Sequence, residues 1–211
     1  MEQFDQYTLR AYHDALAGKG ATPGGGSAAA VIGGLGAALV SMVANLTAGR
    51  KKFAPVEEDM QRLLTESAKL MDTMLRLASE DSVAFDGVMA AYALPKTTDE
   101  EKERRQKAVW QGYRDACQVP LAVAADAVEI LKLAIVAAEK GNPNAVSDAA
   151  VAGYAAYAAL NSALLNVRIN AKYLPDDEWT KNTLQRVEKL RSEGEALQSK
   201  VQAITDSILN A

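Results

Sequence analysis

The sequence is poor in the side chains on which most metal and nucleophilic centres are built. Its 211 residues contain one cysteine, Cys117, and one histidine, His13. A single histidine outside any motif excludes Ser-His-Asp catalysis, and Cys117 has no partner at metal-ligand spacing. We therefore expect no metal and no cofactor, and any catalysis must rest on carboxylates, amides, cationic side chains and backbone dipoles. One cysteine also excludes an intrachain disulfide and suits a protein of the reducing cytoplasm.

Basic residues are outnumbered by acidic ones, and aromatic residues are scarce. Lys and Arg number 23 against 27 Asp and Glu, which gives a net charge of -4 and a pI near 5.2. Arg50-Lys51-Lys52 is too short a basic cluster to neutralise phosphates, so no nucleic-acid partner is expected. Aromatic residues make up 6% of a chain that is 49% hydrophobic and rich in alanine, which favours close-packed helices. No linker-like stretch divides the sequence, and we expect one domain over residues 1–211.

Charge is missing altogether from two long segments, residues 28–49 and 149–167. Both are long enough to raise the question of a membrane span. They consist largely of Ala, Gly and Ser, with Asn45, Asn161 and Ser162 inside, and are only weakly hydrophobic, so we expect no membrane partner. We expect instead two central helices that the other helices surround on all sides.

The rest of the sequence predicts further helices and no strand, since no sustained period-two alternation occurs. Thr98, with Glu101 three residues on, forms a capping-box signature. Pro120 should kink or restart the charged helix that begins there, and Ser147 should cap the second uncharged helix. The fold class is therefore all-α, a single-domain bundle of six to seven helices with two central uncharged helices. Besides these two, the spacing of apolar residues predicts helices over residues 3–16, 56–92, 99–119, 121–140 and 179–208.

The strongest indication of function is the segment Thr22-Pro23-Gly24-Gly25-Gly26-Ser27, which precedes the first uncharged helix. Glycines let a ligand approach main-chain N–H groups, and the first helical turn supplies unpaired donors at the positive end of a dipole. The segment also fits a dinucleotide fingerprint, but that motif requires a preceding strand, and here a helix precedes. A tight turn with close helix packing explains the glycines about as well as a ligand loop does.

Asp81 interrupts the apolar face of the helix predicted over residues 56–92. Met74, Phe85 and Val88 lie on the same face. Burial of a carboxylate is costly without a partner, so Asp81 must be neutral, paired or directed into a cavity. Two explanations for Asp81 are equally open: an ion pair with a buried arginine, or a role in a functional site.

A third group of polar residues flanks the second uncharged segment. Gly141-Asn142-Pro143-Asn144 is a turn, and Ser147 and Asp148 follow it. Capping and a favourable charge in the first turn account for Ser147 and Asp148, but one turn needs only one of the two asparagines. At the other end of the same helix, Asn166 and Asn170 stand one helical turn apart.

Together these segments resemble the cyclodeaminase/methenyltetrahydrofolate cyclohydrolase family, which includes the carboxy-terminal domain of the bifunctional formiminotransferase-cyclodeaminase. The resemblance implies an all-helical, homodimeric, folate-binding enzyme without a metal, and without the transferase domain no formimino transfer is expected. The matching pieces follow the family's order over nearly the whole chain: Thr22 to Ser27, Asp81 to Phe85 with Leu94-Pro95-Lys96, Gly141 to Asn144 with Ser147-Asp148, and Asn166 to Asn170.

The activity that the resemblance implies first is that of a methenyltetrahydrofolate cyclohydrolase, an enzyme that hydrolyses a cyclic amidine to give 10-formyltetrahydrofolate. Formiminotetrahydrofolate cyclodeaminase, in which N10 closes onto the formimino carbon and ammonia leaves, is the alternative. A non-catalytic folate-binding protein is a further alternative. Both reactions need a carboxylate that steadies a cation and moves a proton. Asp81 is the first candidate for that catalytic role, and Asp148 is the second.

The expected substrate site combines the glycine segment with cations and amides. Backbone donors from Gly24 to Ser27 would hold the pterin or a folate carboxylate, and Arg50 or Lys96 would pair with the glutamate tail. The residues expected to bind substrate are Pro23, Gly24, Gly25, Gly26, Ser27, Arg50, Lys96, Asn142, Asn144 and Asn170.

Overall fold

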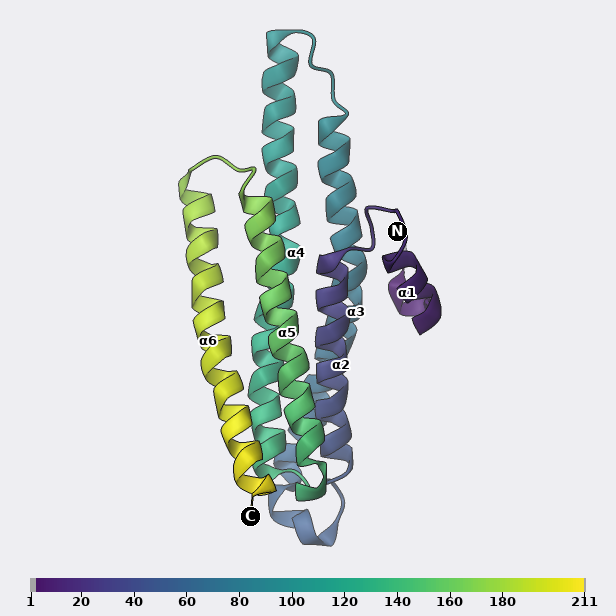
Figure 1. Cartoon of the computed structure of the whole chain (residues 1–211), viewed down its shortest axis with the longest axis vertical. Coiled ribbons are helices and arrows are strands. Elements are labelled where there is room, and N and C mark those ends of the chain that lie inside the picture. Colours follow the sequence, from purple (N-terminus) through teal and green to yellow (C-terminus); the bar gives the residue numbers. More distant parts are fainter. Residues whose placement is uncertain (1–2, 211) are drawn as a thin grey trace.

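The computed structural model describes residues 3–210, which form an elongated bundle of α-helices with no strand within that range (Figure 1). The all-α prediction is confirmed. The six α-helices are α1 (Leu9–Leu16), α2 (Gly25–Asn45), α3 (Glu57–Tyr92), α4 (Asp99–Lys140), α5 (Val146–Ala171) and α6 (Glu178–Leu209). Three short 3-10 helices join them, η1 (Phe4–Gln6), η2 (Lys51–Val56) and η3 (Pro143–Ala145).

The five long helices run along the long axis of the molecule (Figure 1). Helix α2 packs against α3 and α5, while α4 packs against α3, α5 and α6. The chain passes along α2 and α5 in opposite directions, so the start of α2 lies beside the end of α5 (Figure 1). The α3–α4 hairpin extends beyond the other helices at that same end. Chain direction therefore brings the glycine segment and the asparagines of α5 to one end of the bundle.

Small residues let α2 and its neighbours approach closely. A Cβ atom added at Gly36 would lie 3.1 Å from the carbonyl oxygen of Ala152 on α5. A Cβ added at Gly33 would lie 2.8 Å from the Cε atom of Met74 on α3. Alanines such as Ala156 and Ala159 are fully buried at this contact. The uncharged sequence is thus explained by helices whose facing sides carry almost no side chain.

The expectation that other helices surround α2 and α5 on all sides is wrong. Leu35 on α2 is 56% exposed, and Leu165 on α5 is 62% exposed. Each helix packs through its small residues and leaves a stripe of larger apolar side chains that no helix within residues 3–210 covers. The stripe consists of Leu35, Met42, Val151, Tyr154, Leu165 and Ile169.

The observed helix ends agree with those predicted from the sequence in one place and differ from them in two. Thr98 and Glu101 form the predicted capping box. The predicted helix over residues 3–16 is split into η1 and α1, because Thr8 has an extended backbone and accepts a hydrogen bond from the N–H of Ala11. Ser147 does not cap α5, which already begins at Val146 after the turn of η3.

Pro120 does not restart α4, which is one continuous helix of 42 residues with the proline inside. A proline inside a helix removes one N–H donor and leaves the carbonyl four residues earlier without its usual partner. Here that carbonyl belongs to Ala116, and the side chain of Asn170 donates to it from α5. The prediction of two separate helices, 99–119 and 121–140, is therefore wrong, because a neighbouring side chain satisfies the carbonyl.

Candidate functional site

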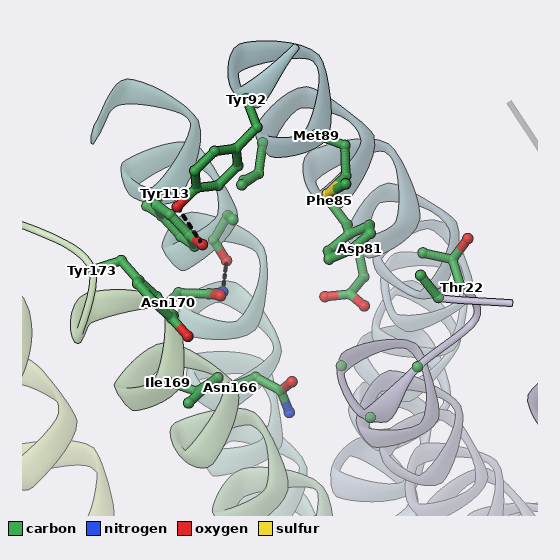
Figure 2. A pocket seen from close by; sticks show the side chains of 16 residues that line it. Thr22, Asp81, Phe85, Met89, Tyr92, Tyr113, Asn166, Ile169, Asn170 and Tyr173 are labelled. Carbon is green, nitrogen blue, oxygen red and sulfur yellow. Dashed lines mark hydrogen bonds between the residues drawn. The ribbon is translucent and has the colours of Figure 1, made fainter. Parts of the chain in front are cut away.

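A cavity of about 340 Å³ opens at the end of the bundle where α2 begins and α5 ends (Figure 2). Four helices and the glycine segment contribute to its wall. Its lining residues are Ala21, Thr22, Gly24, Gly25, Gly26, Asp81, Phe85, Val88, Met89, Tyr92, Tyr113, Ala116, Asn166, Ile169, Asn170 and Tyr173. A concave site of this size, largely apolar with a few convergent polar groups, is typical of small-molecule binding.

Asp81 points from α3 toward the first turn of α2 (Figure 2). Its Oδ2 accepts a hydrogen bond of 3.0 Å from the backbone N–H of Ser27. A Cβ atom added at Gly26 would lie 2.1 Å from Oδ1, so the carboxylate rests directly against the backbone of the glycine segment. Burial raises the pKa of Asp81, and the hydrogen bond from Ser27 opposes part of that rise. No cationic side chain within residues 3–210 forms a salt bridge with it, so the ion-pair explanation does not hold there.

Ser27 also connects this carboxylate to the amino-terminal segment. Its Oγ lies 3.0 Å from the Oη of Tyr12 on α1, at hydrogen-bond distance. Burial raises the pKa of the Tyr12 hydroxyl, and the charge of Asp81 raises it further. The backbone N–H of Phe4 donates to the Oγ of Ser79 on α3 at 3.1 Å, and the rings of Phe4 and Tyr12 pack edge to face. These contacts hold α1 next to the helix that carries Asp81.

Two asparagines of α5 face Asp81 across the cavity (Figure 2). The Nδ2 of Asn166 donates to the carbonyl of Ser162, and the Nδ2 of Asn170 donates to that of Ala116, each at 2.8 Å. A carbonyl oxygen only accepts hydrogen bonds, so Nδ2 must be the atom beside it in both amides. The Oδ1 atom of each amide is then left as an acceptor. The α5 wall of the cavity therefore offers acceptors for N–H groups of a ligand.

Three tyrosines form an aromatic wall beside the asparagines (Figure 2). The rings of Tyr113 and Tyr173 are stacked, with centroids 4.7 Å apart and planes 14° from parallel. Tyr92 packs edge-on against Tyr113, with the two hydroxyl oxygens 3.4 Å apart. Burial raises the pKa of Tyr113, and the hydroxyl of Tyr92 raises it further, so the ring stays neutral at physiological pH. The wall suits a planar aromatic ligand.

Asp81 carries the only charge among the side chains that line this cavity, within the part of the chain that the structure describes. The amides of Gly25 and Gly26 lie in the first turn of α2, where backbone N–H groups have no helical partner. The cavity thus combines one carboxylate, backbone donors, amide acceptors and an aromatic wall. This combination fits a flat, nitrogen-rich heterocycle that carries a positive charge, and the carboxylate can take a proton from water.

The structure brings some of the predicted site residues together. Gly24, Gly25, Gly26, Asp81 and Asn170 all line the cavity. Pro23 is buried between two lining residues in the sequence, Thr22 and Gly24, and Ser27 holds Asp81 by its backbone N–H.

Five other predicted residues lie away from this cavity. Asp148, Asn142 and Asn144 lie at the opposite end of the bundle, because Asp148 is at the start of α5 and Asn170 is at its end. The step of 22 positions from Asp148 to Asn170 corresponds to about 33 Å of helix at 1.5 Å per residue. Arg50 precedes η2 and Lys96 lies in the α3–α4 loop, both exposed. Their roles in substrate binding, and that of Asp148 in catalysis, stay predictions.

Asn142 has a clear structural contact at its own end of the bundle. Its backbone N–H donates to the Oγ1 of Thr47 at 2.8 Å, and its Oδ1 accepts from the N–H of Asn144 at 3.1 Å. A Cβ atom added at the preceding Gly141 would lie 2.3 Å from the carbonyl oxygen of Ala137. The Gly-Asn-Pro-Asn turn therefore joins the end of α2 to the start of α5.

Tyr92, Tyr113 and Tyr173 were not among the predicted site residues. Tyr92 continues the face of Asp81 and Phe85, and Tyr173 follows Asn170 by three residues, so helical spacing alone could have found both. Tyr113 lies in the charged helix that Thr98 caps, and nothing in the local sequence distinguishes it from a surface tyrosine.

Over residues 3–210, the fold and the cavity define an all-helical protein with one acidic group in an aromatic, amide-lined pocket. A family model described as formiminotransferase-cyclodeaminase matches residues 8–189. The chain belongs to the formiminotransferase-cyclodeaminase family, and the resemblance inferred from its motifs is confirmed.

Three similar proteins carry informative names. Methenyltetrahydrofolate cyclohydrolase of Methylorubrum extorquens is 45% identical over 203 residues, which cover 96% of this chain and 98% of that protein. Formimidoyltransferase-cyclodeaminase of Rattus norvegicus is 36% identical over 186 residues, 88% of this chain but 34% of that protein. The crystal structure of formiminotetrahydrofolate cyclodeaminase from Thermotoga maritima superposes with a TM-score of 0.88 at 29% identity, over 97% of this chain and 98% of that one.

Proposed function

We propose that this protein is a methenyltetrahydrofolate cyclohydrolase, an enzyme that opens a cyclic amidinium with water. The observation that carries the proposal is Asp81, the single charged side chain among residues 3–210 that lines a cavity whose other walls are aromatic rings, amides and backbone. The substrate of the Methylorubrum extorquens relative bears a positive charge spread over two nitrogens and the carbon between them. A partly buried carboxylate that forms no salt bridge within residues 3–210 attracts such a charge.

The chemistry assigns Asp81 a proton-transfer role. Water attacks the carbon between N5 and N10, and the ionised Asp81 accepts one of its protons as the tetrahedral carbon forms. The bond from this carbon to N5 then breaks, and Asp81 returns the proton to N5 to leave the N10-formyl product. The second proton of the water is released to solvent. Because burial raises its pKa, Asp81 is a stronger base than an exposed aspartate.

The remaining walls position the heterocycle. The stacked pair of Tyr113 and Tyr173 offers a flat surface for an aromatic ring, and the free Oδ1 atoms of Asn166 and Asn170 accept from its N–H groups. The N–H groups at the start of α2 face the other side and suit a carbonyl oxygen. Lys96 and Arg50 remain candidates for the glutamate tail, which extends out of a cavity of this size.

Cyclodeaminase activity is the second candidate, because the Thermotoga maritima protein carries that name and its chain is matched over almost its whole length. The same carboxylate would move protons while N10 closes onto the formimino carbon and ammonia leaves. A third candidate is a folate-binding protein without turnover. Absorbance separates the three: loss of methenyltetrahydrofolate, its appearance from the formimino compound, or binding of folate with neither change.

The decisive variant in these assays is Asp81→Asn, which keeps an acceptor for the N–H of Ser27 but cannot take a proton. We expect its turnover to fall by about 10²- to 10⁴-fold, the usual contribution of a positioned general base. Asp86, exposed on the same helix, offers a matched control as Asp86→Asn with unchanged turnover. Wild-type turnover in Asp81→Asn would remove this residue from the mechanism.

A homodimer that acts in the cytoplasm is part of the same proposal. The apolar stripe on α2 and α5 is the surface that a second copy would cover, since no helix in the described part of the chain does so. By length and composition, α2 and the stretch Pro143–Ala171 would also be able to cross a membrane, but half of the most apolar part of each is buried inside the bundle. We propose that protein, and not lipid, covers their open faces.

We also propose that the reaction proceeds without a metal or another cofactor, with the tetrahydrofolate derivative as substrate. Within residues 3–210, no three His, Cys, Asp or Glu side chains lie close enough together to hold a metal ion. The proton steps described above require only the carboxylate and water. Turnover that persists after dialysis against a chelator is the result expected.

A further inference from the structure

One carbonyl of α4 lacks the donor that its place in the helix would normally provide. Residue 120 is a buried proline, and it has no N–H to donate to the carbonyl of Ala116 four residues earlier. Asn170 on α5 supplies the missing donor, with its Nδ2 2.8 Å from the Ala116 oxygen (Figure 2). The proline on one helix thus determines what the side chain on another helix bonds to.

This bond also fixes which way the amide of Asn170 faces. Because a carbonyl only accepts, Nδ2 must be the atom next to Ala116, and Oδ1 is left as the free acceptor. Asn170 and Ala116 both line the cavity that holds Asp81. No donor from residues 3–210 forms a hydrogen bond with Oδ1 of Asn170. A bound ligand with an N–H or NH₂ group at this wall would supply one.

We propose that Pro120 is a positioning residue of the site, which holds Asn170 with its oxygen available to an N–H donor of the substrate heterocycle. This inference rests on the proposed function and names the chemical group that the α5 wall recognises. An N–H at position 120 would compete for the Ala116 carbonyl and draw it back into the helical hydrogen-bond pattern. The amide of Asn170 would then be free to rotate, and its oxygen would face the substrate for only part of the time.

A purely structural role makes a different prediction for Pro120→Ala. Alanine restores the helical hydrogen bond and is the best helix former, so either role predicts a protein at least as stable as wild type. A structural role of Asn170, limited to satisfying the Ala116 carbonyl, leaves substrate binding unchanged in that variant. The positioning role requires weaker binding in a protein that is not less stable.

The experiment compares the wild type with Pro120→Ala, Asn170→Ala and the double variant. KM and kcat are measured with 5,10-methenyltetrahydrofolate, and the dissociation constant is measured with 5-formyltetrahydrofolate as a stable probe. We expect Pro120→Ala to raise KM and the dissociation constant roughly fivefold, the effect of one weakened hydrogen bond, with kcat within about twofold. The double variant should bind no more weakly than Asn170→Ala alone, because both changes remove the same contact.

Pro143→Ala is the control, since this exposed proline lies at the opposite end of the bundle. Its KM should equal that of the wild type. An unchanged KM in Pro120→Ala, additive effects in the double variant, or a lowered unfolding midpoint in Pro120→Ala would each overturn the positioning role and leave the proposed function intact. A wild-type protein that neither turns over nor binds either folate would overturn the proposed function and this inference with it.

Discussion

The carboxylate of Asp81 occupies the space that a side chain at Gly26 would need. A Cβ atom at Gly26 would lie 2.1 Å from Oδ1 and 2.5 Å from Cγ of Asp81, well inside any contact distance. The backbone N–H of the next residue, Ser27, donates to Oδ2 of the same carboxylate. The absence of a side chain at Gly26 therefore lets the first turn of α2 contact the carboxylate of Asp81 on α3.

Gly26→Ala should displace Asp81 and remove most of the activity. We expect a loss of about 100-fold in kcat/KM, because a shift of about 1 Å in a catalytic group has an effect of that order. Overpacking should also lower the unfolding free energy by about 1–3 kcal/mol. Steady-state kinetics with a urea titration measure both effects.

Gly87→Ala is the matched control on α3, where an added Cβ would meet nothing within 4 Å. It should keep full activity and gain about 0.5–1 kcal/mol of stability. Full activity in a folded Gly26→Ala protein would contradict the position assigned to Asp81.

The raised pKa of Asp81 predicts a dependence of folding stability on pH. Burial is the first cause of that rise, so the folded protein holds this proton at pH values where the unfolded chain has lost it. Its contribution is therefore fully present below the unfolded pKa of about 3.9 and is lost as pH rises through the folded value. Asp81→Asn removes this dependence.

Urea unfolding of the wild type and of Asp81→Asn at several pH values between about 4 and 7 measures this difference. The stability of the variant relative to the wild type should rise with pH across this window. A relative stability that falls instead would mean that the carboxylate is better stabilised in the folded protein than in water.

The same raised pKa should appear in the pH dependence of turnover. Asp81 accepts a proton only when ionised, so kcat/KM should fall on the acid side with a midpoint above the ordinary aspartate value of about 3.9. The residual activity of Asp81→Asn should lack this acid limb. An acid limb that persists unchanged in the variant would assign it to another group.

Asp148→Asn tests the second carboxylate that the sequence suggested. Asp148 lies in the first turn of α5, at the end of the bundle away from the cavity. We therefore expect the turnover of the variant to stay within about twofold of wild type. The change removes a charge that favours the helix dipole, which should lower stability by about 0.3–1 kcal/mol. A large loss of turnover would restore Asp148 as a catalytic candidate.

The proposed dimer has its own test at Leu165, which is 62% exposed on the open face of α5. A glutamate there would have to be buried without a partner, so Leu165→Glu should shift the protein from dimer to monomer. Leu209→Glu is the control, because Leu209 is 64% exposed near the end of α6. Light scattering after gel filtration gives the mass of each; a monomeric wild type would exclude the dimer.

Patterns confined to one helix were enough to predict much of the site. The spacing between Met74 and Asp81 places the carboxylate on an apolar face, and the glycines before α2 indicate a place of close approach. Both features depend only on helical periodicity and on the size of a side chain. The structure places both in the wall of one cavity.

Features that depend on the packing of two helices could not be predicted from the sequence. The turn at Asn142 has the same Gly, Pro and Asn composition as a ligand loop, but it precedes the start of α5, at the opposite end of that helix from Asn170. Pro120 predicts a helix break unless another helix satisfies the Ala116 carbonyl, and only the packed structure shows that Asn170 does. Tyr113 belongs to the cavity for the same reason, because the turn that follows α5 brings Tyr173 against it.

A crystal structure with bound 5-formyltetrahydrofolate tests the central claim most directly. The account predicts that the folate occupies the cavity between α2, α3, α4 and α5, with its one-carbon group within hydrogen-bond reach of Asp81 and its ring against Tyr113 and Tyr173. A folate bound at the opposite end of the bundle, beside Asn142 and Asp148, would contradict it.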